Sequence, residues 1–295
     1  MLFSPFFMPE WLLVDGSSLI FRAFYGVPAT VKAPDGRQVN AVRGFLETLT
    51  RLIYARRPGR LAIASDVDWR PEWRVELLPG YKLHRTAEPV PPALIPQMPL
   101  IEEILAAAGV DFAGCQGFEA EDVIASWAGR IEGSVEIVSG DRDLFALVRD
   151  PDRKVLYPEK AGLAEVDEAE VSRRYGIPGR SYADFAVLRG DPSDGLPGLN
   201  GVGGKKAAEL IRRYGGVAGI LAEARLSEAD RDYLERASRV VMPVTEVPVE
   251  VPEGRRDAYP AKPERFLTLA EANGIESTAE RFLGALWVLA KAGAG

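Results

Sequence analysis

The chain contains very little of the two residue types that most often bind transition metals. Among its 295 residues there is one cysteine, Cys115, and one histidine, His84. A single cysteine excludes an internal disulfide and a cysteine-based zinc cluster, and a single histidine excludes a metal site built on several imidazoles. Any bound metal must therefore be held by oxygen atoms, which favours Mg²⁺ or Mn²⁺.

Long hydrophobic runs and a secretory leader are also missing. No apolar stretch reaches the length of a membrane span, and residues 1–9 have neither the basic flank nor the small-residue cleavage site of a signal peptide. We therefore expect a cytoplasmic protein that does not bind a membrane. Its 47% content of apolar residues is enough to fill one large α/β domain or a core domain with a helical annex.

Basic residues do not predominate, which at first argues against a nucleic-acid ligand. Lys and Arg number 36 against 43 Asp and Glu, for a formal net charge of −7, whereas domains that bind nucleic acids are usually basic. The total is not decisive, because acidic residues gathered at one site would leave a basic surface elsewhere. The positions of the charges therefore matter more than their sum.

Three apolar segments each end in an aspartate, and segments with helical periodicity lie between and beside them. The apolar segments are residues 11–15, 61–66 and 135–141, which end in Asp15, Asp66 and Asp141. The helical segments are residues 41–54, 94–108 and 120–131. This alternation predicts an α/β fold with a central, mostly parallel sheet flanked by helices. In such a sheet the aspartates lie at the carboxyl ends of the strands, where ligands bind.

The remaining segments predict an insertion and a helical C-terminal region. Residues 69–97 are rich in Pro, Arg and aromatic residues and have no long periodicity, which indicates an excursion from the sheet. Beyond about residue 175 the pattern is helical, with a glycine-rich hinge and an extended linker at residues 243–252. We expect an α/β catalytic core at residues 1–174 and a helical region at residues 175–295.

Acidic residues cluster at several places along the chain and are candidate metal ligands. They are Asp15, Asp66, Asp68, Glu119, Glu121, Asp122, Asp141, Asp143, Asp191 and Asp194. Any one of them alone has an ordinary structural explanation as a helix cap or as a partner of a helix dipole. If they converge on one cleft, their mutual repulsion requires cations. Two divalent ions about 4 Å apart would activate water and stabilise the leaving oxygen of a phosphodiester.

Two further segments suit a nucleic acid. In the excursion, Lys82 and Arg85 are spaced to meet a phosphate while Tyr81 stacks on an unpaired base; the alternative is a solvated basic loop. The second segment is a glycine-rich turn followed by basic residues, typical of a helix-hairpin-helix at about residues 182–215. Its alternative is a plain glycine turn between two helices. The residues concerned are Gly198, Gly201, Gly203, Lys205 and Lys206.

In order and spacing, these segments resemble the bacterial 5′-nuclease, or flap endonuclease, family, which includes the 5′-3′ exonuclease domain of DNA polymerase I. The resemblance runs from about Trp11 to the last helix. It rests on Leu-Val-Asp-Gly-Ser-Ser at 13–18 with Arg22, residues 40–45, Gly80-Tyr-Lys, Glu119-Ala-Glu-Asp-Val, Gly140-Asp-Arg-Asp-Leu, Gly190-Asp-Pro-Ser-Asp and the hairpin glycines. It implies a PIN-like core, a helical arch at residues 69–97, and a free-standing nuclease or an excised domain.

The resemblance also implies roles for the candidate residues. The ion nearest the reaction would be bound by Asp15, Asp66, Glu119, Glu121 and Asp122, and a second ion by Asp141, Asp143, Asp191 and Asp194. Lys82 and Arg85 would contact the scissile phosphate. The expected catalytic residues are these two together with Asp15 and Asp122. Tyr81 would stack on a nucleotide, and Arg22 and Arg74 would assist DNA binding. The helix-hairpin-helix would bind duplex DNA, with a K⁺ ion held by its backbone carbonyls.

The sequence departs from the family pattern at a few positions. Ser65-Asp66 followed by Asp68 replaces the usual Phe-Asp, so either aspartate could be the ligand at the second strand. Glu121 stands where Asp is more usual, and its longer side chain would shift a metal position. Gly195 stands where Asn is common, which we expect to change the stiffness of the loop.

Together these features predict a structure-specific 5′ nuclease that hydrolyses DNA near junctions of single-stranded and duplex DNA by a two-metal mechanism. Its expected partner is branched or 5′-flap DNA, with an RNA–DNA substrate left open, and the chain is expected to act as a monomer. One alternative is a non-catalytic protein that binds branched DNA and uses its acids only for stability. The other is a metal-dependent small-molecule phosphatase in which Asp141 is the nucleophile.

Overall fold

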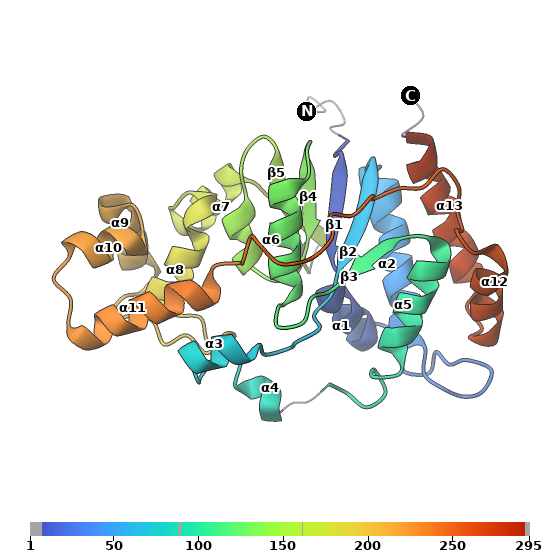
Figure 1. The fold of residues 1–295 in the computed structure, drawn as a ribbon, viewed down its shortest axis with the longest axis horizontal. Coiled ribbons are helices and arrows are strands. Elements are labelled where there is room, and N and C mark those ends of the chain that lie inside the picture. The colour runs from blue at the N-terminus through green and yellow to red at the C-terminus, as the bar shows by residue number, and fades with distance from the viewer. Residues whose placement is uncertain (1–7, 88–89, 161, 293–295) are drawn as a thin grey trace.

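A computed structural model describes residues 8–87, 90–160 and 162–292, so that residues 88 and 89 of the predicted arch lie outside the described residues. At its centre is a six-stranded sheet with the order β3-β2-β1-β4-β5-β6 (Figure 1). The strands are β1 (Trp11–Asp15), β2 (Arg60–Ala64), β3 (Asp111–Ala113), β4 (Val135–Val138), β5 (Arg153–Glu159) and β6 (Gly162–Val166). All neighbours pair in parallel except β5 and β6, which form an antiparallel hairpin. The predicted mostly parallel sheet is confirmed.

The central strand β1 shows why these residues form a buried parallel sheet. All five of its residues are buried, and Leu13 pairs with Ala62 of β2 on one side and with Ile137 of β4 on the other. Successive side chains of a strand point to opposite faces. Leu13 therefore packs in one hydrophobic core, whereas Leu12 and Val14 pack in the other. A strand covered on both faces reads as a continuous apolar run, which is the pattern that predicted it.

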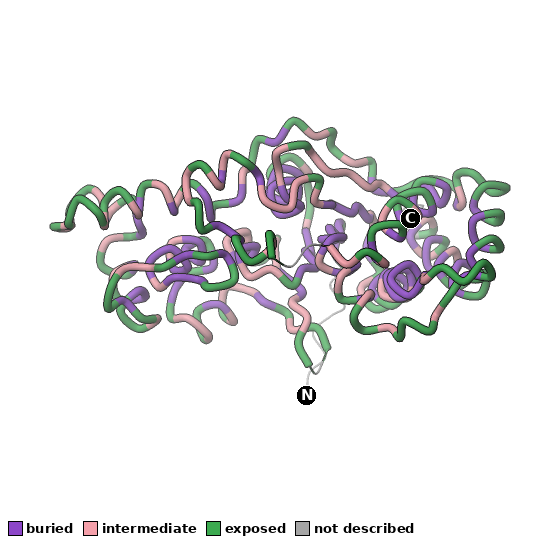
Figure 2. The backbone as a smooth tube through the Cα atoms, turned by 90° about the horizontal axis from the view of Figure 1, so that it is seen from below, coloured by how far each residue is buried: buried purple, intermediate pink, exposed green. Residues whose placement is uncertain are grey.

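Different sets of helices cover the two faces. One face is covered by α1 (Gly16–Gly26), α2 (Asn40–Arg56), α5 (Gln97–Ala108), α12 (Pro263–Ala272) and α13 (Glu276–Ala292). The other is covered by α6 (Ala120–Arg130) and the helices that follow the sheet. Figure 2 shows the buried segments of these two groups, each surrounded by exposed turns. Within the described part of the chain, no helix is long and apolar enough to cross a membrane.

The helices beyond the sheet extend to one end of the molecule (Figure 1). They are α7 (Glu168–Tyr175), α8 (Tyr182–Arg189), α9 (Gly204–Tyr214), α10 (Val217–Glu223) and α11 (Glu228–Val241). After α11, residues 243–262 cross back without helix or strand, and α12 and α13 then pack beside α5 and α2. The division of the chain at residue 174 stays a prediction, and these last two helices lie with the core rather than with α7 to α11.

The excursion at residues 69–97 forms two short helices at the carboxyl edge of the sheet. These are α3 (Glu72–Leu77) and α4 (His84–Ala87), which lie below the sheet in Figure 1. The guanidinium Nε of Arg74 in α3 donates to the carbonyl oxygen of Val240 in α11 at 3.0 Å. The arch is therefore attached to the helical region as well as to the core.

Candidate active site

A cleft of about 670 Å³ lies at the carboxyl edge of the sheet, where ligands were expected. Its walls include five of the predicted acids and both predicted phosphate-contacting cations. The acids are Asp15, Asp66, Glu119, Glu121 and Asp141, and the cations are Lys82 and Arg85. The end of β1, the loops after β2 and β4, and the start of α6 supply the acids, while the arch supplies the cations. Segments far apart in the sequence thus meet in one place.

Asp15 is a helix cap and a cleft residue at the same time. Its Oδ1 accepts a hydrogen bond from the backbone N–H of Ser18 at 2.9 Å, which caps α1, and the Ser139 hydroxyl donates to its Oδ2. Burial and the nearby charge of Asp66 raise the pKa of Asp15 from 3.8 to about 7. Asp15 can therefore cap α1 and also serve in the cleft.

The structure separates Asp66 from Asp68. Asp66 lines the cleft, and its Oδ1 accepts from the backbone N–H of Ala120 at the start of α6, at 2.7 Å. Asp68 instead accepts from the amide of Gln116 at 2.7 Å and from the backbone N–H of Gly117 at 2.6 Å. Its carboxylate closes the loop before α6 rather than lining the cleft. The metal contact expected of Asp68 stays a prediction, and these contacts do not support it.

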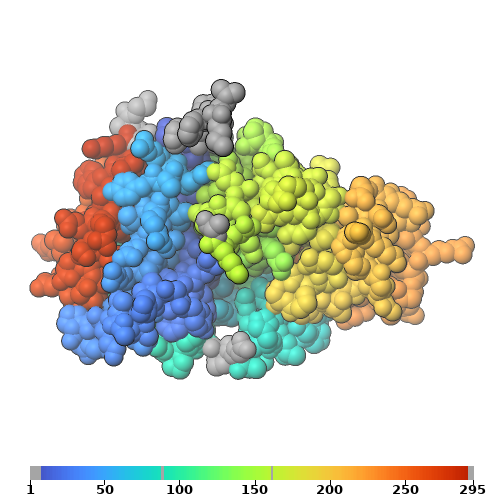
Figure 3. All heavy atoms as spheres, turned by 180° about the vertical axis from the view of Figure 1, so that it is seen from behind, coloured from blue at the N-terminus to red at the C-terminus, as the bar shows by residue number. Residues whose placement is uncertain are grey.

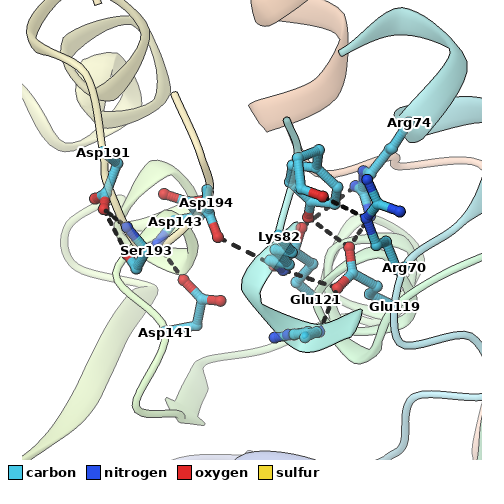
Figure 4. A network of polar contacts seen from close by, with 12 residues as sticks. Arg70, Arg74, Lys82, Glu119, Glu121, Asp141, Asp143, Asp191, Ser193 and Asp194 are labelled. Atoms are coloured by element: carbon cyan, nitrogen blue, oxygen red, sulfur yellow. Dashed lines mark hydrogen bonds and ion pairs between the residues drawn. The ribbon is translucent and has the colours of Figure 1, made fainter. Parts of the chain in front are cut away.

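Three acids come close enough together to share a cation. Oxygen atoms of Glu121, Asp141 and Asp143 all lie within 4.8 Å of one another. Asp194 lies next to them, across from Lys82 (Figure 4). Burial, together with neighbouring carboxylates, raises the pKa of Glu121 and of Asp143 well above the usual range, and burial raises that of Asp194. Buried like charges at this separation need compensation, and hard oxygen donors suit Mg²⁺ or Mn²⁺.

Asp191 lies at the edge of this acidic group and has protein partners on both oxygens. Its Oδ1 accepts from the backbone N–H of Ser193 at 3.0 Å and from the hydroxyl of the same serine. Its Oδ2 accepts from Arg142 at 3.2 Å and from Arg189 at 3.3 Å. Its observed contacts organise the loop after α8.

Glu119 lies on the opposite wall and is surrounded by donors from the arch. Its Oε2 accepts from Arg74 and from the hydroxyl of Tyr81, each at 2.6 Å. Its Oε1 accepts from Lys82 at 2.7 Å and from Arg85 at 3.2 Å (Figure 4). Burial disfavours the charged carboxylate, but Lys82 and Arg74 outweigh it and lower the pKa of Glu119. Burial likewise opposes the charge of Lys82, yet the surrounding Tyr81 and carboxylates hold its pKa well above the usual range.

Two residues expected to contact DNA are buried. Tyr81 is 2% exposed and Arg74 is 0% exposed. In this structure the ring of Tyr81 is not exposed for stacking on a base, and Arg74 forms ion pairs inside the protein with Glu119, Glu121 and Asp122. The DNA contacts expected of both residues stay predictions that this burial does not support. Both residues hold the arch against α6.

Asp122 is also placed behind the cleft rather than in it. It is fully buried, and its Oδ1 accepts from Arg74 and from the backbone N–H of Val244, both at 2.8 Å. Its Oδ2 accepts from the backbone N–H of Glu119 at 3.1 Å. These contacts fix the start of α6, and the catalytic and metal-binding role expected of Asp122 stays a prediction that they do not support.

Sequence reasoning missed an aromatic group at the cleft. Phe21 and Tyr25 of α1 and Trp69 of the arch line it, and the rings of Phe21 and Trp69 lie 4.7 Å apart. The available signal was the four-residue spacing of Phe21 and Tyr25, which places them on one face of the helix that Asp15 caps.

The predicted helix-hairpin-helix corresponds to α8, a glycine-rich turn and α9. Gly198 and Gly201 have φ values of +72° and +68°, a left-handed conformation that favours glycine. A Cβ atom on Gly198 would lie 2.6 Å from the backbone of Arg189, so the turn also needs glycine for its close approach to α8. Lys205 and Lys206 are exposed in the first turn of α9. The positive end of that helix therefore faces solvent beside two cations.

Comparisons with known proteins point to one family. Residues 10–176 match the family described as 5′-3′ exonuclease, N-terminal resolvase-like domain, and residues 177–252 match 5′-3′ exonuclease, C-terminal SAM fold. A 5′-3′ exonuclease of Streptomyces coelicolor is 45% identical over 304 residues, which cover 93% of this chain and 99% of that protein. A DNA polymerase I of Mycobacterium bovis is 42% identical over 220 residues, which cover 72% of this chain and 24% of the polymerase.

A solved structure has the same fold over nearly the whole chain. The D15 flap endonuclease of bacteriophage T5, in a complex with DNA and metal ions, has a TM-score of 0.66 and 17% identity and covers 95% of this chain and 99% of its own. At 17% identity this similarity shows a shared fold. The family matches, in contrast, show that the sequences are related. This chain therefore belongs to the 5′-3′ exonuclease family and is related to the 5′-nuclease domain of DNA polymerase I.

Proposed function

We propose that this 5′-3′ exonuclease, a phosphodiester hydrolase that acts on DNA, cuts at or near a junction of single-stranded and duplex DNA and leaves a 5′-phosphate and a 3′-hydroxyl. The observation that carries the proposal is the cluster of Glu121, Asp141 and Asp143, whose oxygen atoms lie within 4.8 Å of one another. Lys82 lies in the opposite wall of the same cleft, 3.8 Å from Asp194.

Divalent metal ions fit the donor set of this cluster. Glu121, Asp141 and Asp143 would hold the metal, with Asp15 and Asp66 on the neighbouring strand ends and Asp194 beside Lys82. These donors are all carboxylate oxygens, which favours Mg²⁺ or Mn²⁺. Such ions, when bound, activate water and neutralise charge on the reacting phosphate. We propose two ions.

The chain itself supplies cations for the phosphate. Lys82 and Arg85 line the cleft, and Glu119 orients both side chains through hydrogen bonds to its Oε1. A positive charge that is fixed before the substrate arrives stabilises the negative charge that develops on the phosphate oxygens during hydrolysis. We assign this role to Lys82 and Arg85.

Surfaces on either side of the cleft provide a track for DNA. On one side Lys205 and Lys206 at the start of α9 would meet the backbone of duplex DNA, with a K⁺ ion held by carbonyl oxygens of the glycine turn. On the other side Arg22 and Arg51 line two adjoining grooves over α1 and α2. Figure 3 shows this side, where α1 and α2 lie next to the β5–β6 hairpin. A chain of net charge −7 thus has basic groups where a branched or 5′-flap substrate would lie.

The test compares the wild-type chain with Asp141→Asn on a 5′-labelled flap duplex in Mg²⁺, in Mn²⁺ and in chelator. Cuts at the junction that need both a metal and Asp141 are the expected result. Cleavage that persists in chelator would contradict the proposal, and so would products that start only from a blunt 5′ end. An RNA-containing flap and light scattering of the free protein test the substrate preference and the expected monomer.

Membership in an exonuclease family disagrees with both alternatives from the sequence. A non-catalytic binder predicts tight binding of the flap without turnover, and a small-molecule phosphatase predicts turnover of a phosphomonoester. A flap-binding measurement and a generic phosphomonoester substrate, run beside the cleavage assay, distinguish both outcomes.

A further inference from the structure

Glu119 differs from its neighbour Glu121 in what surrounds its oxygen atoms. Glu121 has oxygen within 4.8 Å of Asp141 and Asp143 and one ion pair, with Arg74 at 3.3 Å, whereas Glu119 accepts hydrogen bonds from Arg74, Tyr81, Lys82 and Arg85. The two glutamates lie two positions apart at the start of α6, so that their side chains point in different directions.

The acceptor capacity of Glu119 is filled by the protein. An ionised carboxylate offers about four lone-pair sites, two on each oxygen. Oε2 receives Arg74 and Tyr81, and Oε1 receives Lys82 and Arg85, so that each oxygen has two donors. Glu119 is 2% exposed. A cation at this carboxylate would have to displace one of these donors and lie beside a positive charge.

The donors all come from the arch, and one of them is held in an unfavourable backbone conformation. Lys82 has a φ of +45°, which is uncommon for a residue with a Cβ, and its backbone N–H donates to the carbonyl oxygen of Asp194 at 3.1 Å. Such a conformation persists only where the surroundings restrain it. The ion pair between Lys82 and Glu119 supplies that restraint from the side-chain end.

We propose that Glu119 is a positioning residue of the arch and not a metal ligand. Its carboxylate fixes the Lys82 ammonium and the Arg85 guanidinium at the cleft, and it anchors Arg74 and Tyr81 behind them. This inference rests on the proposed contact of Lys82 and Arg85 with the phosphate. It assigns Glu119 a different role from that of Glu121, although both belong to the same sequence motif.

The first experiment measures metal binding without DNA. Titration calorimetry with Mn²⁺ is carried out on the wild type, on Glu119→Gln and on the matched control Glu121→Gln. We expect Glu119→Gln to keep the Kd for Mn²⁺ within about threefold, because its oxygens face arch donors, and Glu121→Gln to weaken it at least about tenfold. Equal weakening by both variants would overturn the inference.

The second experiment is a double-mutant cycle on single-turnover cleavage. If Glu119 acts through the arch cations, Glu119→Gln lowers the rate roughly a hundredfold in the wild type but only about threefold when Lys82→Ala is already present. The Kd for flap DNA is expected to change less than about threefold in Glu119→Gln, since the carboxylate contacts no substrate. Losses that multiply independently would show that Glu119 does not act through Lys82.

A milder variant covers the case in which Glu119→Gln does not fold. Tyr81→Phe removes one donor from Oε2 and keeps every charge, so we expect unchanged Mn²⁺ binding and a faster proteolytic cut within residues 69–97. If Lys82→Ala cleaves as fast as the wild type, the phosphate role under the proposed function fails. Mn²⁺ binding and proteolysis still decide whether Glu119 anchors the arch, so the two failures are distinguishable.

Discussion

The two walls of the cleft use the same residue type in opposite electrostatic settings. On the acidic wall, burial and neighbouring carboxylates raise the pKa values of Glu121 and Asp143, although Arg74 lies 3.3 Å from Glu121. On the arch wall, Glu119 lies among cations, and its pKa is lowered. The arch wall is satisfied by the chain itself, whereas the acidic wall carries charge that a bound cation would balance. A carboxylate in a functional cleft is therefore understood from its neighbours rather than from its motif.

The largest expected effect, on cleavage, comes from a substitution in the acidic wall. Asp143→Asn removes one of three clustered carboxylates, and we expect cleavage of a 5′-flap duplex to fall roughly 10³-fold in Mg²⁺. Because the same change removes repulsion between buried acids, the metal-free variant is expected to melt at a higher temperature than the wild type. Cleavage assays and thermal melts in chelator check both halves. A variant that lost activity and also lost stability would remove the distinction between the walls.

A substitution that removes a cation from the arch wall should instead destabilise the fold. Arg74→Met leaves Glu119, Glu121 and Asp122 buried with fewer partners, and we expect a loss of about 3–5 kcal/mol in the free energy of unfolding. The matched control is Arg142→Met, because Arg142 pairs with Asp191 but is 36% exposed. Its loss is expected to stay below about 1 kcal/mol. Urea unfolding of both variants measures the difference, and equal losses would contradict it.

The pH dependence of the metal-free protein sharpens the comparison. The pKa of Asp15 is 3.8 in the unfolded chain and about 7 in the folded protein. Between these values the folded state holds a proton that the unfolded state has released, so stability falls as the pH rises through this window. From pH 6 to pH 8 we expect Asp15 alone to account for a loss of about 1 kcal/mol.

The raised pKa values of Asp66, Glu121, Asp143 and Asp194 act in the same direction. The lowered pKa of Glu119 affects the stability of the fold only in more acidic solution. Thermal melts at several pH values in chelator check the sign, and Asp15→Asn should flatten the slope. A stability that rose from pH 6 to pH 8 would show that the buried acids are charged in the metal-free fold.

The smallest expected effect concerns an acid that belongs to neither wall. Asp68→Asn keeps an acceptor for Gln116 and Gly117, and we expect Mn²⁺ affinity and cleavage to stay within about threefold of the wild type. Asp66→Asn should lower both at least about tenfold, since Asp66 lines the cleft. Calorimetry and cleavage rates of the two variants decide between them. A larger effect at Asp68 would restore the alternative that the sequence left open.

The sequence predicted the elements whose pattern is local. β1, β2 and β4 are buried on both faces, so they appear as continuous apolar runs that lead to acids. The β5–β6 hairpin was not predicted, because charged residues such as Lys154 and Glu165 interrupt its apolar pattern. The acids that gather at the strand ends followed from the parallel topology.

The sequence could not predict which way each side chain of the site faces. Glu119, Glu121 and Asp122 are nearly adjacent, yet only Glu121 shares a cluster with Asp141 and Asp143. The difference arises because Arg74, 45 positions before Glu119, enters behind α6. The burial of Tyr81 likewise depends on contacts with α6 that no local pattern contains.

The hydrogen bonds of Lys82 and Arg85 to Glu119 have a consequence for the thermodynamics of substrate binding. Long flexible side chains lose considerable rotational entropy when they are fixed, and for an exposed cation this loss accompanies the arrival of the ligand. In this protein Lys82 is 3% exposed and already ordered, so that its entropy is lost during folding. The base of the arch is therefore preorganised, and the affinity gained from these cations is less opposed by entropy.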